Sequence, residues 1–275
     1  MKRRVIALAG LTLVGLLAGC AQDTPILPSG PPPLAKFSAA AQLSAAVTER
    51  LKADKTAKMT ITGGVDGQPD QQFYGVGVLR QDEGGTTMQF AEQIQRPSAA
   101  PVEVRLVVQP GATFLKPPAD AVLPPRKSWL QLGSYTTDPL YRRFLPMAAA
   151  LRTYADPQAF FAQYGDAITI TKSAEDPIDG TRAVRYNLHA DLAETGSATQ
   201  ANAGITQAAL HATIPDNLTS VDYTIWIDEN NHPIRTLVDE PIPGAPGAYN
   251  LDSHYTRWGE PVYIGLPNPL QVTQQ

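Results

Sequence analysis

The stretch AVRYNLHADL, residues 183–192, decides which fold this chain adopts. Every second side chain in it is apolar, and these side chains share one face of an extended strand: Val184, Tyr186, Leu188 and Ala190. The side chains between them are polar. A period of two with one polar face is typical of antiparallel strands that are buried on one side only.

Further segments repeat this alternation, and we expect each to be a strand of the same sheet: VDYTIWIDE (221–229), AKMTITG (57–63), TTMQFAEQI (86–94), PVEVRLVVQ (101–109) and AITITKS (167–173). The phase of the first of these places Ile225 on the same face as Tyr186, on a neighbouring strand. Turn signals rich in Gly, Asn and Asp separate the strands: GGVDGQPD (63–70), DEGG (82–85) and DENNHP (228–233).

Helical signals are fewer. Residues 36–55 form an Ala-rich amphipathic stretch, and Asp138-Pro139 and Asp156-Pro157 each resemble an N-cap followed by proline at the first helical position. They introduce predicted helices at 140–155 and 158–167, the first interrupted at Pro146 because proline lacks an N–H group. The sequence therefore predicts an α+β fold, in which a few α-helices cover the concave face of a curved antiparallel sheet.

The only cysteine of the chain lies near the N-terminus, in the stretch LLAGCAQDTPILPSGPPPL (16–34). A basic start at residues 2–4 precedes an apolar run at 5–17, which has the length of a signal-peptide core rather than of a membrane-spanning helix. Leu17-Ala18-Gly19-Cys20 then matches a bacterial lipobox. This predicts cleavage between Gly19 and Cys20 and lipid attachment to the Cys20 sulfur. A secretory signal with an incidental cysteine, or a short anchor helix, is the alternative.

These signals divide the chain into three predicted parts. Residues 1–19 are a lipoprotein signal peptide, residues 20–34 are an acylated Pro- and Gly-rich tether, and residues 35–275 are a single domain. Within the last part, the sequence shows no stretch of linker composition and no fixed-period repeat.

The charge balance narrows the choice of partners. Removal of residues 1–19 takes away three of the 22 Lys and Arg side chains and none of the 26 Asp and Glu, which leaves a net charge of −7. An acidic chain of this kind is a poor ligand for nucleic acid or for anionic headgroups. We therefore expect the acyl chains at Cys20 to hold a monomer on the extracytoplasmic face of the cell membrane.

Catalytic and metal-binding motifs are absent from the sequence. It contains no G-x-S-x-G, S-x-x-K, H-E-x-x-H, C-x-x-C or phosphate-binding P-loop pattern. Its histidines are dispersed at His189, His211, His232 and His254, and the acidic segments DPIDG (176–180) and DENNHP lack EF-hand spacing. We expect a protein that is not an enzyme and binds neither a cofactor nor a metal ion.

The order of these elements and several motifs resemble the mycobacterial LppX/LprG-type lipoproteins. The motifs are KSWLQL (127–132), YTIWIDENNHPIRTLVD (223–239) and YTRWGEPVYIGLPNP (255–269), with Trp129, Trp226-Ile227, Trp258-Gly259 and Pro267. The resemblance implies a half-barrel similar to the Lol-type lipoprotein carriers, with an acylated lipid or glycolipid held between sheet and helices and no catalytic residues. The segment at 193–217 is longer than in that family, so that the opening of a lipid cavity in this chain can differ from the opening in the family.

Two further features favour a lipid cavity. Gly75 and Gly77, in FYGVGV (73–78), share one face of a strand, which leaves space or permits curvature. The apolar face also recurs on more strands than the short helices are expected to cover. An ordinary close-packed core uses the same apolar positions, however. Two alternatives to a lipid carrier therefore stay open. One is an envelope interaction module with a close-packed core that docks on a membrane transporter or wall enzyme, and the other is a sensor of small amphiphiles.

The side chains that we expect to line the cavity are the apolar ones on the inward phase of the strands and on the first mid-chain helix. They are Met59, Ile61, Val76, Val78, Met88, Phe90, Val104, Leu106, Phe144, Leu145, Ile168, Ile170, Val184, Tyr186, Leu188, Tyr223, Ile225 and Ile227.

Overall fold

The strands of the chain form one open sheet. The structure, a computed structural model, describes residues 31–68, 72–96, 99–132, 139–191, 220–241 and 248–273, and within these ranges the sheet has twelve strands. They are β1 (Thr56–Val65), β2 (Phe73–Asp82), β3 (Gly85–Arg96), β4 (Ala99–Gln109), β5 (Ala112–Lys116), β6 (Trp129–Leu132), β7 (Ile168–Glu175), β8 (Ala183–Asp191), β9 (Ser220–Asp228), β10 (Pro233–Pro241), β11 (Ala248–Thr256) and β12 (Val272–Thr273).

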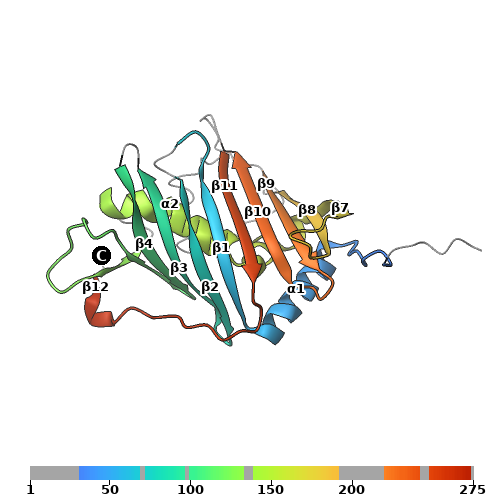
Figure 1. Cartoon of the computed structure of the whole chain (residues 1–275), viewed down its shortest axis with the longest axis horizontal. Helices are drawn as coiled ribbons and strands as arrows, with labels where there is room; N and C mark the ends of the chain where they lie inside the picture. The colour runs from blue at the N-terminus through green and yellow to red at the C-terminus, as the bar shows by residue number, and fades with distance from the viewer. Residues whose placement is uncertain are drawn as a thin grey trace, which may run out of the picture. The chain divides into compact units, whose positions relative to one another are not determined.

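The order of the strands across the sheet is β12-β6-β5-β4-β3-β2-β1-β11-β10-β9-β8-β7. Each neighbouring pair is antiparallel except β12 with β6, which is parallel. Pairing of β1 with β11 joins the early strands to the late strands in the middle of the sheet (Figure 1). Each strand predicted from the alternation is present, and KSWLQL contains β6.

Tight turns connect the predicted hairpins. Gly85 begins β3 with a φ of 116°, a conformation that favours glycine, directly after the turn at 83–84. Asn231 takes a φ of 66° in the turn between β9 and β10. The first turn signal is placed differently from the prediction, because Gly63 and Gly64 continue β1 and the chain turns at Asp66 and Gly67.

Three α-helices lie within the described ranges: α1 (Ala40–Asp54), α2 (Pro139–Tyr154) and α3 (Pro157–Tyr164). α3 begins as predicted, because the Asp156 carboxylate accepts a hydrogen bond of 2.9 Å from the backbone N–H of Gln158. The predicted break at Pro146 is wrong, since α2 continues through it. Buried residues on both sides of the proline, Phe144 and Met147, hold α2 against the core despite the lost backbone hydrogen bond.

The hydrophobic core lies between one face of the sheet, here called the inner face, and the helices. In Figure 1, α2 crosses the sheet behind the labelled strands and α1 lies at its lower end. Leu43, Val47 and Leu51 follow one another at four-residue spacing along α1, so that a single side of this helix is buried. They belong to the same cluster of buried side chains as alternate residues of β1 to β4 and of β7 to β11.

Residues 34–275 form a compact unit separate from residues 1–33. Every buried residue of the core cluster lies between Leu43 and Tyr255, so this unit contains its own hydrophobic core. A unit with its own core is able to fold when it is produced alone.

The C-terminal segment covers part of the other face of the sheet, here called the outer face. The backbone N–H of Gly265 donates a hydrogen bond of 2.8 Å to Gln89 Oε1 on β3. Val107, which pairs with Gln89 across β3 and β4, is fully buried on this outer face, and Ile264 is buried as well. The segment then ends in β12 beside β6, which extends the sheet at that edge.

Candidate functional site

The inner face of the sheet is the candidate site. Because each strand alternates between its two faces, residues that lie opposite one another across successive strands form rows on the inner face. One row crosses eight neighbouring strands from β4 to β8: Val104, Glu92, Gly75, Ile61, Ser253, Thr236, Ile225 and Tyr186. The direct pairing of Ile225 with Tyr186 confirms the predicted orientation of these two strands.

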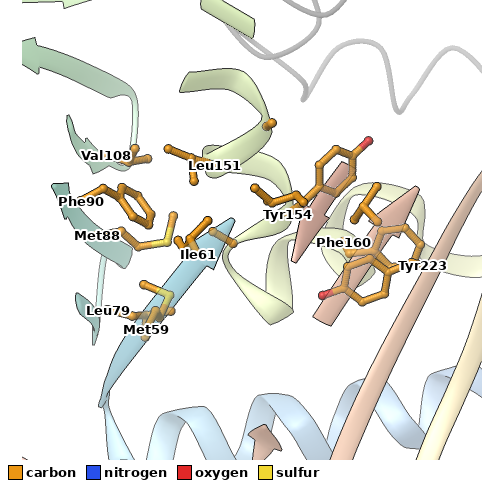
Figure 2. Packing of buried hydrophobic residues seen from close by; sticks show 14 of the residues in the cluster. Met59, Ile61, Leu79, Met88, Phe90, Val108, Leu151, Tyr154, Phe160 and Tyr223 are labelled. Atoms are coloured by element: carbon orange, nitrogen blue, oxygen red, sulfur yellow. The ribbon is translucent and has the colours of Figure 1, made fainter. Parts of the chain in front are cut away.

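Most of the predicted cavity residues lie on this inner face or on the helix that covers it. They belong to the core cluster or pack against it: Met59, Ile61, Met88, Phe90, Val104, Leu106, Phe144, Ile168, Ile170, Val184, Tyr186, Leu188, Tyr223, Ile225 and Ile227. Figure 2 shows the packing of several of them against Leu151 and Tyr154 of α2. The side chain of Leu145, and the residues Gly19 and Cys20, lie outside the described part of the chain.

Two predicted residues are on the wrong face. Val76 is 57 % exposed, and Val78 shares its face of β2. The physical reason is that Gly75 and Gly77 occupy the inward phase of this strand, so that the valines between and after them point outward.

The two glycines do not leave empty space. A Cβ atom on Gly77 would lie 2.7 Å from Cδ1 of the Phe90 ring, and a Cβ atom on Gly75 would lie 2.1 Å from the Ala91 carbonyl oxygen and 2.5 Å from Glu92 Oε2. The side chains of β3 therefore fill the room that glycine leaves on β2. The prediction that these glycines leave space is wrong for the described conformation, whereas the alternative, that they permit curvature of the sheet, stays a prediction.

Glu92 is the main feature of the inner face that the pattern analysis missed. It is fully buried, and neither carboxylate oxygen has a hydrogen-bond partner in the described part of the chain. Burial raises the pKa of Glu92 to about 9, so that the side chain is a neutral carboxylic acid at neutral pH. A signal for it exists in the sequence, because in TTMQFAEQI the glutamate takes the inward phase set by Met88, Phe90 and Ile94.

Aromatic side chains form the part of the inner face below α3. The Phe160 ring stacks on the Tyr223 ring with a centroid distance of 4.2 Å (Figure 2). The Tyr255 hydroxyl donates a hydrogen bond of 3.0 Å to the backbone carbonyl of Ala155 and lies 3.1 Å from Thr236 Oγ1. Burial raises the pKa of Tyr223 well above its ordinary value. These contacts connect the α2–α3 junction to β9, β10 and β11.

A small cavity of about 120 Å³ lies beneath residues 34–37, here called the strap, which precede α1. Val184, Tyr186 and Ile227 of the inner face line it together with the strap and the turn after β9. The Phe37 N–H donates a hydrogen bond of 3.0 Å to the Tyr186 hydroxyl, and the Leu34 N–H donates one of 2.7 Å to Glu175 Oε1. The strap thus covers the inner face at β8 and β9.

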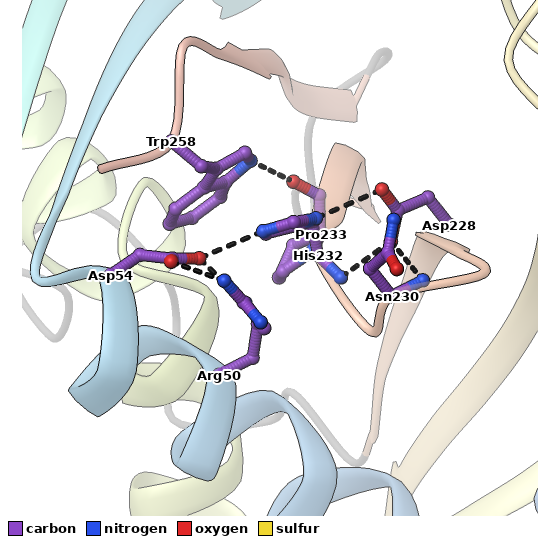
Figure 3. A network of polar contacts seen from close by, with 7 residues as sticks. All are labelled: Arg50, Asp54, Asp228, Asn230, His232, Pro233 and Trp258. Atoms are coloured by element: carbon purple, nitrogen blue, oxygen red, sulfur yellow. Dashed lines mark hydrogen bonds and ion pairs between the residues drawn. The ribbon is translucent and has the colours of Figure 1, made fainter. Parts of the chain in front are cut away.

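A polar network fixes the C-terminal end of α1 to the sheet (Figure 3). His232 Nε2 lies 2.8 Å from Asp54 Oδ2 on α1, and His232 Nδ1 lies 2.9 Å from Asp228 Oδ2 at the end of β9. Arg50 forms an ion pair with the same Asp54. Burial by itself lowers the pKa of His232, but the hydrogen bonds to Asp228 and Asp54 outweigh this effect and raise it.

The network around His232 joins α1 to the end of β9, and we interpret it as structural. Of the other histidines in the sequence, His189 Nδ1 lies 2.8 Å from Asp222 Oδ1, and His254 Nε2 lies 3.3 Å from Asp252 Oδ1. His211 lies outside the described residues. Within the described ranges, His, Cys, Asp and Glu do not gather in threes as a metal-ion site, and no helix there is long and apolar enough to cross a bilayer.

Comparison with known proteins finds similarity only among solved structures. No protein-family model matches the chain, and no curated protein matches it. The structure is similar to LprF from Mycobacterium bovis, at 16 % identity and a TM-score of 0.39 over 85 % of this chain and 99 % of LprF. It is also similar to the LolA superfamily protein NE2245 from Nitrosomonas europaea, at 10 % identity and a TM-score of 0.30 over 84 % and 96 % of the two chains.

LprF is one of the LppX/LprG-type lipoproteins, so the resemblance drawn from the sequence motifs recurs in this comparison. A third similar structure is a β-barrel-like protein of a family of unknown function from Brucella abortus, at 9 % identity and a TM-score of 0.32 over 74 % and 95 % of the chains. At TM-scores below 0.5 these likenesses carry no argument about function, which rests on the inner face itself.

Proposed function

We propose that this protein is a non-enzymatic lipoprotein of the cell envelope that binds an acylated lipid or glycolipid between the inner face of the sheet and the helices. The observation that carries this proposal is the composition of the inner face. It is mostly apolar across eight neighbouring strands, yet it contains the Glu92 carboxyl, whose oxygens have no hydrogen-bond partner in the described part of the chain. A ligand with acyl chains and a few polar groups complements such a surface.

In this proposal the sheet is a half-barrel, and the helices and the strap cover its concave inner face. In this proposal the described conformation is a closed one, because the side chains of the inner face pack against one another. Acyl chains enter when the helices and the strap separate from the sheet. A cavity of about 120 Å³ lies beneath the strap, beside Val184, Tyr186 and Ile227 of the inner face.

The energetics of such a carrier are nearly balanced. Each methylene group that leaves water contributes about 0.8 kcal/mol, but the chains of a membrane lipid are already out of water in the bilayer. The net free energy of transfer from bilayer to protein is therefore small, which suits both loading and release. Polar contacts then determine which lipid is bound.

The N-terminus supplies the anchor in this proposal. Cleavage after Gly19 leaves Cys20 as the first residue, with lipid on its sulfur, and residues 20–34 connect it to the single domain at 35–275. The protein then resides on the extracytoplasmic face of the cell membrane as a monomer. A membrane transporter that supplies or removes the lipid is the expected partner.

The close packing of the inner face favours a second candidate function. Phe90, Ile225 and Leu106 are fully buried among other side chains of the core cluster, as in an ordinary close-packed core. The outer face meanwhile exposes Tyr74 and Val76 side by side on β2. These observations suit an interaction or sensor module that docks on a membrane or cell-wall partner.

Native mass spectrometry of the unit 34–275, exported in its own host behind a cleavable secretion signal and purified gently, separates the two candidates. The carrier predicts protein with an added mass that tandem fragmentation assigns to a lipid with acyl chains. The same sample after extraction with organic solvent is the control and should show the bare mass. A bare mass before extraction contradicts the carrier and favours the interaction module.

A further inference from the structure

The environment of Glu92 combines three observations. The carboxyl is fully buried on the inner face, neither of its oxygens has a hydrogen-bond partner in the described residues, and its neighbours in the row are Gly75 and Val104. Its neighbours along the same face of β3 are Phe90 and Ile94, which are also buried. The carboxyl is therefore a single polar group in an apolar part of the inner face.

This arrangement costs stability and contributes nothing to the core. A buried polar group without a partner is destabilising, and an apolar side chain of the same size would pack at this position without that cost. The backbone of β3 already requires glycine at position 75, since a Cβ atom there would lie 2.1 Å from the Ala91 carbonyl oxygen, and Glu92 Oε2 occupies the space beside it, 2.5 Å from the same point.

We propose that Glu92 is the polar recognition point of the lipid site, and that its carboxyl hydrogen-bonds an uncharged ester or hydroxyl group that links the acyl chains of the ligand. This inference rests on the proposed function, since it concerns the same inner face. The ligand class it names is a neutral acylated glycerol or sugar, in which polar linkages lie directly beside the chains.

The chemistry of the carboxyl selects this class. With a pKa of about 9, Glu92 is protonated at neutral pH and offers one O–H donor and one carbonyl acceptor. An ester carbonyl accepts from the O–H group, and a hydroxyl both donates and accepts. An ammonium group would require an ion pair in these apolar surroundings, where burial of charge is expensive. A neutral linkage is therefore the better match.

Binding of two probes to the unit 34–275 tests this inference. The probes are a hexadecanoyl monoglyceride and hexadecane, which share a chain length but differ in polar groups. Glu92→Met removes the hydrogen bond and keeps the length of the side chain, whereas Glu92→Gln keeps both a donor and an acceptor. We expect Glu92→Met to bind the glyceride about three- to tenfold more weakly and hexadecane with unchanged affinity. Glu92→Gln should bind both probes within about twofold of the wild type.

The outcomes separate this inference from the proposed function. Wild-type protein that binds neither probe contradicts the proposed function, and the role of Glu92 with it. If the wild type binds both probes, two results for Glu92→Met contradict only the role of Glu92. In the first, the variant binds the glyceride as well as the wild type does. In the second, its affinity for both probes falls by the same factor. Thermal melting of each variant checks the fold, and Glu92→Leu replaces the methionine variant if that one melts lower than the wild type.

Discussion

Glu92 occupies a position where the alternation of β3 favours an apolar side chain. Its folded-state pKa of about 9 lies far above the ordinary value of 4.5, because burial disfavours the charged form. The folded protein therefore retains a proton that the unfolded chain releases. Between these two pKa values, the free energy of unfolding falls as the pH rises, by up to about 1.4 kcal/mol per pH unit.

Replacement of Glu92 by Gln tests this linkage. Because the amide does not ionise, the variant should gain stability relative to the wild type as the pH rises from about 5 to about 8, and the two proteins should be closest in stability near the lower value. Urea unfolding at several pH values measures the difference. A difference that is independent of pH would show that Glu92 is ionised, or paired, in the folded protein.

Ile225 reports on the packing of the inner face. It is fully buried opposite Tyr186, so that Ile225→Trp overfills a close-packed region and should lower the free energy of unfolding by roughly 1–3 kcal/mol. The neighbouring Thr224→Trp, whose side chain lies on the outer face, is the control and should change stability less. Both variants are unfolded in urea after removal of lipid, since a bound ligand stabilises by mass action. An unchanged stability of Ile225→Trp would show that space adjoins Ile225.

At the scale of the elements, α1 depends on contacts at its C-terminal end. The pKa of His232 is raised, so its contribution is complete below the ordinary value of 6.5 and is lost as the pH rises through the folded-state value. The pKa of Asp54 is lowered, chiefly by its hydrogen bond with Arg50. The contribution of Asp54 is therefore lost only as the pH falls through its folded-state value, below 3.8.

Loss of the His232 proton should weaken the attachment of α1. In the Glu92→Gln background, where residue 92 does not titrate, we expect the free energy of unfolding to fall as the pH rises through the folded-state pKa of His232, which lies above 6.5. Adding His232→Gln should abolish this fall. Hydrogen exchange of the α1 amides, followed below and above this pKa, localises the effect. Equal pH dependence with and without His232 would contradict the assignment.

At the scale of the whole molecule, the predicted anchor decides where the protein resides. Cys20→Ala removes the sulfur that accepts the lipid, so we expect an uncleaved precursor that incorporates no labelled fatty acid. Metabolic labelling and fractionation of the membrane measure both properties. Ser29→Ala, a change in the same proline-rich segment, is the control and should be processed normally. Normal cleavage and membrane retention of Cys20→Ala would refute the lipobox.

The pairing of β1 with β11 joins strands that are distant in the sequence, and it determines which residues face one another in the middle of the sheet. Met59 lies opposite Tyr255, and Ile61 lies opposite Ser253. The inner face is continuous from β4 to β8 only because of this pairing. A lipid site on this face is therefore a property of the complete sheet and not of either set of strands.

The sequence by itself determined the local features of this protein. Alternation with a period of two identified strands such as β8 and β9 and the faces of Tyr186 and Ile225, because the direction of a side chain in a strand depends only on its phase. The pair Asp156-Pro157 identified the start of α3, because capping uses groups within one turn. Most of the residues of the candidate site followed from the same alternation.

The tertiary structure decided everything that depends on contacts between distant segments. Over residues 73–78 of β2 the side chains of both phases are small, aromatic or aliphatic, and the pairing with β1 and β3 showed that Gly75 and Gly77 face inward and Val76 outward. The continuation of α2 through Pro146 depends on packing against the core. The contact of His232 with Asp54 joins residues far apart in the sequence, and the burial of Glu92 depends on its neighbours across the sheet. A period describes one strand, whereas burial and pairing are set by the surfaces that the strand meets.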